Sequence, residues 1–154
     1  MTTDLFPDVE LAAQPAAYWT GVAYEALIAF TRARQAELGF TQPQFWLLRN
    51  LSGNDLSPDG DGMTIPELRQ AMRTYLRAED DLAAEAEVLV GRGWLSRAGE
   101  RLRITEAGEE ARVGLKQHAP AIRARIHQGI DDADYVTTLK VLRQMIRNTG
   151  GPVD

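Results

Sequence analysis

The sequence predicts a mainly α-helical fold with one short β-hairpin. Two long segments, residues 15–38 and 106–148, repeat apolar residues at three- and four-residue spacings, which is the pattern of amphipathic helices. Between them, residues 94–104 (WLSRAGERLRI) alternate apolar and polar side chains on both sides of Gly99, which is the pattern of two strands joined by a tight bend. Helices therefore dominate, and the hairpin is the expected piece of sheet.

The composition is that of an ordinary globular protein. The 154 residues are most simply one domain, 1–154, which is long enough to bury a core. No apolar run approaches the ~20 residues that a membrane span needs, so we expect no membrane partner. The chain has no cysteine, and its N-terminus lacks a basic-then-apolar leader. We therefore expect a cytoplasmic protein without disulfides or thiolate metal sites.

Capping residues mark where individual helices begin. Thr41 and Thr64 each precede a helical pattern and are followed by a proline in the first turn, as at a helix N-terminus. Thr105 begins the long helical region after the hairpin, which Pro120 is expected to kink. Two short helices, the hairpin and long flanking helices thus follow one another along the chain.

The hairpin is expected to have one apolar face and one basic face. The period-two alternation assigns three residues to each face: Leu95, Leu102 and Ile104 to the first, and Arg97, Arg101 and Arg103 to the second. Exposed strands often carry arginine, so this ribbon alone would indicate only a solvated surface. Its position after two short helices and before a long one indicates a more specific architecture.

Four pieces of residues 41–108 carry a resemblance: FTQPQFWLLRNL, MTIPELRQAM, LVGRGWLSR and LRITEAGEEA, of which the last is the most specific. In this order they resemble the winged-helix domain of MarR-type transcriptional regulators. Residues 15–38 and 106–148 are then similar to the family's dimerisation helices. The resemblance implies a winged helix-turn-helix homodimer that binds pseudo-palindromic double-stranded DNA, more often as a repressor than an activator, and that a small ligand or an oxidant often releases.

The resemblance implies DNA contacts from the helix-turn-helix and from the wing, as the hairpin is called in this fold. The residues available for these contacts are Arg69, Arg73, Thr74, Arg77, Arg97, Arg101 and Arg103. The wing is shorter than is usual in the family, with only RAGERLR at its tip. The arginines must therefore supply most of the attraction to phosphates.

The expected recognition helix is acidic. It starts at about Ala78, or at Leu76 in its longest form, and over residues 76–92 it has two arginines against five carboxylates, a net charge of −3. The face opposite its apolar stripe is expected to present Arg77, Asp80, Ala84, Glu87 and Gly91. Carboxylates near phosphates oppose binding. This feature favours an alternative, a winged-helix module that does not read DNA and instead binds a protein partner or a small ligand.

Aromatic residues occur where the family's ligand cleft would lie. Tyr24, Phe45 and Trp46 are candidates to bind a small lipophilic or aromatic effector, although helical spacing makes them core residues first and pocket walls second. Because there is no cysteine, peroxide cannot release the protein through a thiol, which leaves a ligand, a metal or methionine chemistry.

Motifs for catalysis or cofactor binding are missing from the sequence. His118 and His127 are nine residues apart, whereas two histidine ligands on one helical face are four apart. The sequence has no glycine-rich phosphate loop after a strand and no Gly-x-Ser-x-Gly nucleophile. We therefore expect no enzyme activity, no cofactor and no metal site.

Overall fold

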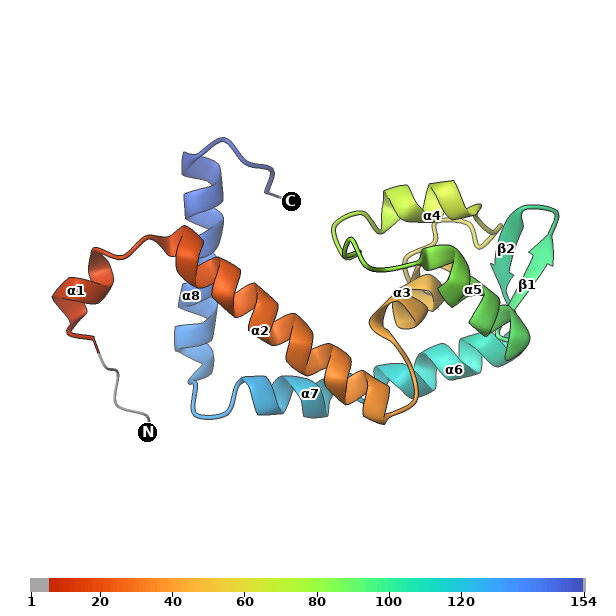
Figure 1. Ribbon diagram of the computed structural model, residues 1–154, viewed down its shortest axis with the longest axis horizontal. Helices are drawn as coiled ribbons and strands as arrows, with labels where there is room; N and C mark the ends of the chain where they lie inside the picture. Colours follow the sequence, from red (N-terminus) through yellow and green to blue (C-terminus); the bar gives the residue numbers. More distant parts are fainter. Residues whose placement is uncertain (1–5, 154) are drawn as a thin grey trace. The chain divides into compact units, whose positions relative to one another are not determined.

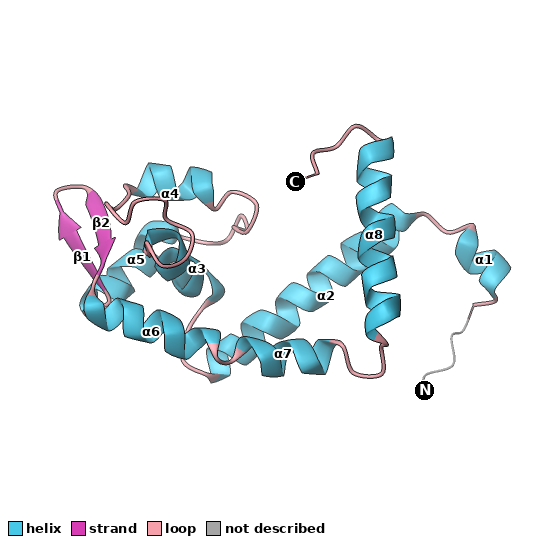
Figure 2. Ribbon diagram, turned by 180° about the vertical axis from the view of Figure 1, so that it is seen from behind, coloured by secondary structure: helices cyan, strands magenta, loops and turns pink. Residues whose placement is uncertain are grey.

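The computed structural model describes residues 6–153, which form two compact units (Figures 1 and 2). The larger unit extends from Ala16 to Ile122, and the smaller unit combines the two ends of the chain. The elements, in chain order, are α1 (Asp8–Ala12), α2 (Ala16–Glu37), α3 (Gln42–Leu51), α4 (Ile65–Ala71), α5 (Leu82–Gly91), β1 (Leu95–Ala98), β2 (Arg101–Ile104), α6 (Glu106–Lys116), α7 (Ala119–Ile126) and α8 (Asp132–Asn148). The predicted mainly α-helical fold with one hairpin is confirmed.

The helix starts predicted at Thr41, Thr64 and Thr105 are confirmed by side-chain caps. The Thr41 hydroxyl accepts a hydrogen bond from the Gln44 amide, and the Gln44 side chain accepts one from the Thr41 amide, so α3 begins with a capping box. The Thr64 hydroxyl caps α4 by accepting a hydrogen bond from the Glu67 amide, and the Thr105 hydroxyl caps α6 by accepting one from the Gly108 amide. Each cap satisfies a backbone N–H that the first helical turn leaves without an internal partner.

The region around Pro120 differs from the predicted kink. The helix stops at Lys116, and a new helix, α7, begins at Ala119 with the proline in its first turn. Proline has no N–H to donate within a helix, and the first turn is where this loss costs least. The short helix α1 was also not anticipated from the sequence.

One apolar core joins the helices and the hairpin of the larger unit. Its buried side chains come from α3, from α4 and the residue after it, from α5 and from both strands: Leu47, Leu48, Leu51, Leu68, Met72, Leu82, Ala86, Leu89, Leu95 and Leu102. Because interiors of this kind are close-packed, α4, α5 and the hairpin cannot shift independently of α3. The core therefore holds the two short helices and the wing in one geometry.

The strand register corrects the predicted faces of the hairpin. Leu95 pairs with Ile104 and Arg97 pairs with Leu102, with Gly99 at φ 65° in the bend. Residues directly opposite each other lie on the same face. Arg97 therefore lies on the face of Leu102, and its predicted place beside the other two wing arginines is wrong. The prediction failed because Arg97 is two residues from Leu95, and residues two apart in a strand share a face.

A third short segment and a close backbone contact attach the wing to the rest of the unit. Met63 and Leu102 exchange backbone hydrogen bonds of 3.0 and 2.8 Å. At the other end of the hairpin, a Cβ added to Gly108 would lie 2.1 Å from the carbonyl oxygen of Trp94. Only glycine allows α6 to pass this close to the strand, which explains the glycine in the TEAGEEA segment.

Buried charges hold α6 against the end of α3. Arg112 pairs with Asp55 at 3.3 Å and with Glu109 at 3.0 Å, and Glu109 accepts a hydrogen bond of 2.7 Å from the Ser52 hydroxyl. Burial alone would raise the pKa of Asp55, but a hydrogen bond from Arg49 and nearby positive charges lower it below its usual value. The loop after α3 is thereby tied to α6.

None of the helices formed by residues 6–153 is long and apolar enough to cross a membrane.

Candidate nucleic-acid interface

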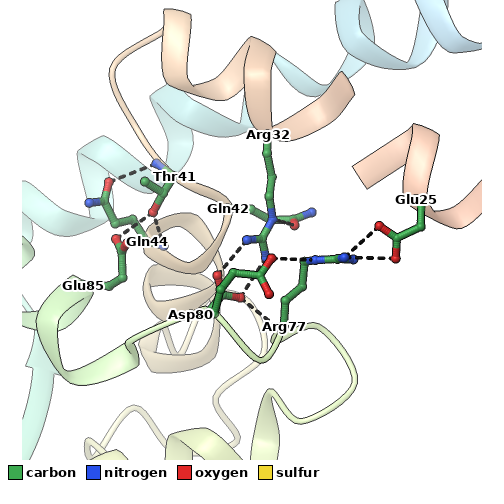
Figure 3. A network of polar contacts seen from close by, with 9 residues as sticks. Glu25, Arg32, Thr41, Gln42, Gln44, Arg77, Asp80 and Glu85 are labelled. Atoms are coloured by element: carbon green, nitrogen blue, oxygen red, sulfur yellow. Dashed lines mark hydrogen bonds and ion pairs between the residues drawn. The ribbon is translucent and has the colours of Figure 1, made fainter. Parts of the chain in front are cut away.

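The start of α5 is set by the carboxylate of Asp80. Arg32 of α2 donates two hydrogen bonds to this carboxylate, at 2.7 and 2.9 Å, and the backbone amide of Arg77 donates a third at 2.8 Å (Figure 3). The chain from Arg77 to Asp80 is consequently a turn. Asp81 then caps α5 by accepting a hydrogen bond of 3.1 Å from the Ala84 amide. The prediction of a helix from Leu76 or Ala78 is wrong, because the Asp80 carboxylate stabilises a turn at these residues and the helix begins only at Leu82.

Asp80 also does not occupy the exposed face that the sequence predicted for it. Its side chain is only 8 % exposed. The pKa of Asp80 is lowered, mainly by the hydrogen bond from Arg32. Burial acts in the opposite direction and raises this pKa, whereas the hydrogen bond from the Arg77 amide lowers it further. Asp80 is therefore a buried, ionised link between α2 and the turn before α5.

Every carboxylate between residues 76 and 92 has a partner within the larger unit. In addition to Asp80 and Asp81, Glu79 accepts a hydrogen bond of 3.0 Å from Arg77, and Glu85 accepts one of 2.7 Å from the Thr41 hydroxyl. Glu87 forms an ion pair with Arg97 of the wing. The five acidic groups are thus used to position the turn, α5 and the wing, and part of their charge is compensated locally.

Two of the arginines predicted to contact DNA, Arg77 and Arg97, are paired with carboxylates of the chain. The Arg77 guanidinium donates to both carboxylate oxygens of Glu25, at 2.8 and 3.0 Å (Figure 3). It also lies 5.7 Å from the centre of the Tyr24 ring. The hydrogen bond that Arg77 donates to Glu25 is the main reason why the pKa of Arg77 is raised above its ordinary value. Arg97, similarly, is paired with Glu87. These two arginines connect elements to each other.

The remaining predicted arginines are exposed on α4, directly after it and on β2. We call Arg69, Arg73, Arg101 and Arg103 the cationic rim. Arg73 donates to the carbonyl of Gln70 at 2.9 Å, a bond that leaves its charge uncompensated. Arg101 donates to the carbonyl of Gly62 at 2.7 Å, and Glu67, with 3.8 Å between the charged atoms, compensates part of its charge. Within residues 6–153, Arg69 and Arg103 have no ion-pair partner. Thr74, beside Arg73, is also exposed.

The wing and the start of α4 border a common hollow. Its volume is about 310 Å³, and it is lined by Thr64, Ile65, Pro66, Arg97, Gly99 and Glu100. Arg101 reaches across from β2 toward Glu67 of α4, with 3.8 Å between the charged atoms. The two ends of the cationic rim are therefore parts of neighbouring elements, α4 and the wing.

The three predicted ligand residues lie in two surroundings: Tyr24 is beside Arg77, whereas Phe45 and Trp46 are both beside Arg49. Tyr24 lies beside Arg77, and Phe45 packs edge-on against Phe40 with 6.2 Å between ring centres. Trp46 stacks on Tyr75 at 4.0 Å with the ring planes 11° apart. The guanidinium of Arg49 lies 4.5 Å from the centre of the Trp46 ring.

The residues that sequence reasoning missed are Glu25 and Arg32 of α2. Arg32 is separated from Asp80 by 48 positions, and Glu25 from Arg77 by 52. Their only signal in the sequence is a charged residue within an amphipathic helix, and that signal does not identify a partner. Only the folded chain brings these groups together.

Asp80→Asn should lower the free energy of unfolding by about 1–3 kcal/mol at pH 7, because it removes the charge that holds Arg32. The pKa of Asp80 is lower in the folded than in the unfolded chain, so its contribution is complete above about pH 4 and is lost as the pH falls further. The gap between wild type and variant should therefore close in acid. Urea unfolding between pH 2 and pH 7 measures this.

Glu79→Gln is the matched control, since the Glu79 side chain is 67 % exposed and contacts the same Arg77. It should leave the free energy of unfolding close to that of the wild type. A gap between wild type and Asp80→Asn that stays constant down to pH 2 would contradict the role given to the Asp80 carboxylate.

No protein-family model matches the chain, and neither does any curated protein sequence. Solved structures do match it. A MarR family transcriptional regulator from Silicibacter pomeroyi is 18 % identical, with a TM-score of 0.66 over 94 % of this chain and 99 % of that one. The reduced form of MarR from E. coli is 16 % identical, with a TM-score of 0.66 over 91 % and 99 %.

A third similar structure is that of Bordetella bronchiseptica BpsR, described for the regulation of its DNA binding by 6-hydroxynicotinic acid. It is 17 % identical, with a TM-score of 0.62 over 86 % of this chain and 94 % of that one. Sequence identities this low show a shared fold. The resemblance read from the four sequence pieces is therefore confirmed at the level of architecture: the chain has the winged helix-turn-helix fold of the MarR-type transcriptional regulators.

Proposed function

We propose that the protein is a DNA-binding transcriptional regulator that acts as a homodimer, as a repressor. The observation that carries the proposal is the cationic rim, which places exposed arginines on α4, directly after it and on the wing strand β2. The whole chain has a net charge of −5, so these arginines are a local concentration against an acidic background. A local positive surface is what binding to phosphates requires.

The use of the carboxylates supports DNA binding over the alternative of a winged-helix module that does not read DNA. That alternative depended on an acidic recognition helix. Within α5 itself only Glu85 and Glu87 are acidic, and each has a partner in the chain. The repulsion that five outward carboxylates would exert on phosphates is correspondingly reduced.

Arg103→Ala should weaken binding to duplex DNA by a similar factor for every sequence, because a contact to phosphate carries no sequence information. It should also lower the slope of log K against log salt by ~1, since one fewer counterion is released. Fluorescence anisotropy with the region upstream of the protein's own gene and with an unrelated duplex, over a series of salt concentrations, measures both effects.

Arg34→Ala is the control, since Arg34 is an exposed α2 arginine paired with Glu37 at 2.6 Å. It should leave the salt slope unchanged. If the wild-type protein binds neither duplex at low salt, DNA binding is excluded and the partner-binding alternative takes its place.

The homodimer part of the proposal is supported by apolar side chains that remain exposed on the long helices. On α2 these are Tyr18, Trp19, Val22, Leu27 and Phe30, and on α8 they are Val136, Leu139, Val141, Met145 and Ile146. Such an amount of exposed apolar surface is unusual for a monomer. A symmetric pairing that buries it would also provide two winged helices for a pseudo-palindromic site.

Light scattering of the wild-type protein should give about twice the chain mass of 17.1 kDa. Leu139→Glu should shift the protein toward the monomer, because it places a charge among the apolar residues of α8. Leu56→Glu, at an equally exposed position in the loop after α3, is the control and should stay dimeric. A monomer at micromolar concentration in the wild type would refute the homodimer.

We further propose that a small lipophilic or aromatic ligand near Tyr24, Phe45 and Trp46 releases the DNA. Tyr24 is half-exposed and lies on Arg77, which leads directly into the turn before α5. A ligand that displaced this contact would act on the segment that sets the start of α5. The similar BpsR, whose DNA binding 6-hydroxynicotinic acid regulates, gives this part of the proposal support by analogy.

Titration with a panel of aromatic acids should quench tryptophan fluorescence in the wild type and much less in Trp46→Phe, because Trp46 would lie nearest to the ligand. The chain has three tryptophans, so the variant identifies the responding one. A panel that leaves the wild-type fluorescence unchanged, or an equal response in Trp46→Phe, would contradict this location of the ligand site.

A further inference from the structure

The outward surface of α5 has almost no polar side chains. Leu82, Ala86 and Leu89 of this helix are buried in the core. The exposed residues on the opposite side are Ala84, Glu87, Val88 and Gly91, which we call the α5 outer strip. Val88 is 44 % exposed, which is unusual for a branched apolar side chain in the middle of a helix.

The α5 outer strip has no side-chain hydrogen-bond donor. Arginine, lysine, asparagine and glutamine are the side chains that commonly read bases in the major groove, and none of them is present on this strip. Glu87 is its single polar residue, and its carboxylate is paired with Arg97. Recognition by donated hydrogen bonds is therefore not available to the middle of this helix.

One group in the major groove matches a surface of this kind. Thymine presents a C5-methyl group there, which other bases lack and which apolar side chains contact. Ala84 and Val88 are one helical turn apart and offer methyl groups on the same side of α5. At Gly91 an added Cβ would meet no atom within 4 Å, so the helix backbone itself can come close to a neighbouring surface.

We propose that the α5 outer strip reads thymine methyl groups in the major groove through Ala84 and Val88. The inference rests on the proposed function, since it concerns how the same helix would distinguish one DNA sequence from another. Each half-site of the operator then contains thymines at the positions that face these two residues. The cationic rim supplies the attraction to phosphates, and the apolar residues of the α5 outer strip supply the selectivity.

Charge placement favours DNA over a protein partner for this strip. An apolar helix face that docks a protein is usually bordered by polar groups of mixed sign. Here positive charge predominates on α4 and β2: Arg69, Arg101 and Arg103 are exposed there, and the one exposed carboxylate of these two elements, Glu67, is paired with Arg101, while Glu100 is exposed in the bend of the hairpin. A double-stranded polyanion fits an apolar strip next to such cations.

The experiment begins with selection of bound duplexes from a randomised DNA pool by the full-length wild-type protein. Each thymine of the selected site is then replaced by uracil, which removes the C5-methyl group and leaves every hydrogen-bonding group in place. At the contacted positions this change should weaken binding by about fourfold each, the factor that corresponds to one buried methyl group. The change is made in the DNA, so loss of folding cannot imitate it.

Val88→Ala connects the effect to the protein. In this variant, uracil should cost little at the position that faces residue 88 and the full factor at the others. Val113→Ala, which shortens a valine that is 50 % exposed on α6, should behave as the wild type does.

Two results would overturn the inference, and they are distinguishable. If the wild type selects a site but uracil substitution leaves its affinity unchanged, the reading of thymine methyl groups is refuted while DNA binding stands. If no duplex is selected and none binds at low salt, the proposed function fails as well, and the strip is then a surface for a protein partner.

Discussion

The ion pair between Arg32 and Asp80 determines how the helix-turn-helix of this protein is built. A carboxylate this well buried is stable only while the guanidinium and the backbone amide of Arg77 both donate to it. The amide donation closes the turn that α5 follows, so the start of that helix depends on a residue of α2. The same pair makes α2, which also carries exposed apolar residues, part of the framework of the larger unit.

A protein with a net charge of −5 can present a positive surface because the carboxylates between residues 76 and 92 are buried or have partners within the chain. Asp80 faces Arg32, Glu85 faces the hydroxyl of Thr41, and Glu87 faces Arg97. Paired charges produce a weak field at a distance, whereas exposed and unpaired arginines produce a strong one. The location of each charge is therefore more informative about partners than the total.

Mostly apolar contacts hold the wing rigidly in place. Leu95 and Leu102 belong to the core, Met63 adds backbone hydrogen bonds to the same strand, and Gly108 lets α6 approach Trp94 closely. These contacts orient β2, and with it Arg101 and Arg103. A short wing can thus present its charges in a defined direction, because the strands that carry it have little freedom.

Local rules were sufficient to predict the fold class, the three threonine caps and the presence of the hairpin, since each depends on residues within a few positions of one another. Thr41, Thr64 and Thr105 cap the helices that follow them directly, and Gly99 bends the hairpin between its own strands. The start of α5 and the partners of Arg77 and Arg97 were decided by tertiary structure. Arg32 and Glu25 lie 48 and 52 positions from their partners, and no local pattern in a single sequence indicates contacts across such a separation.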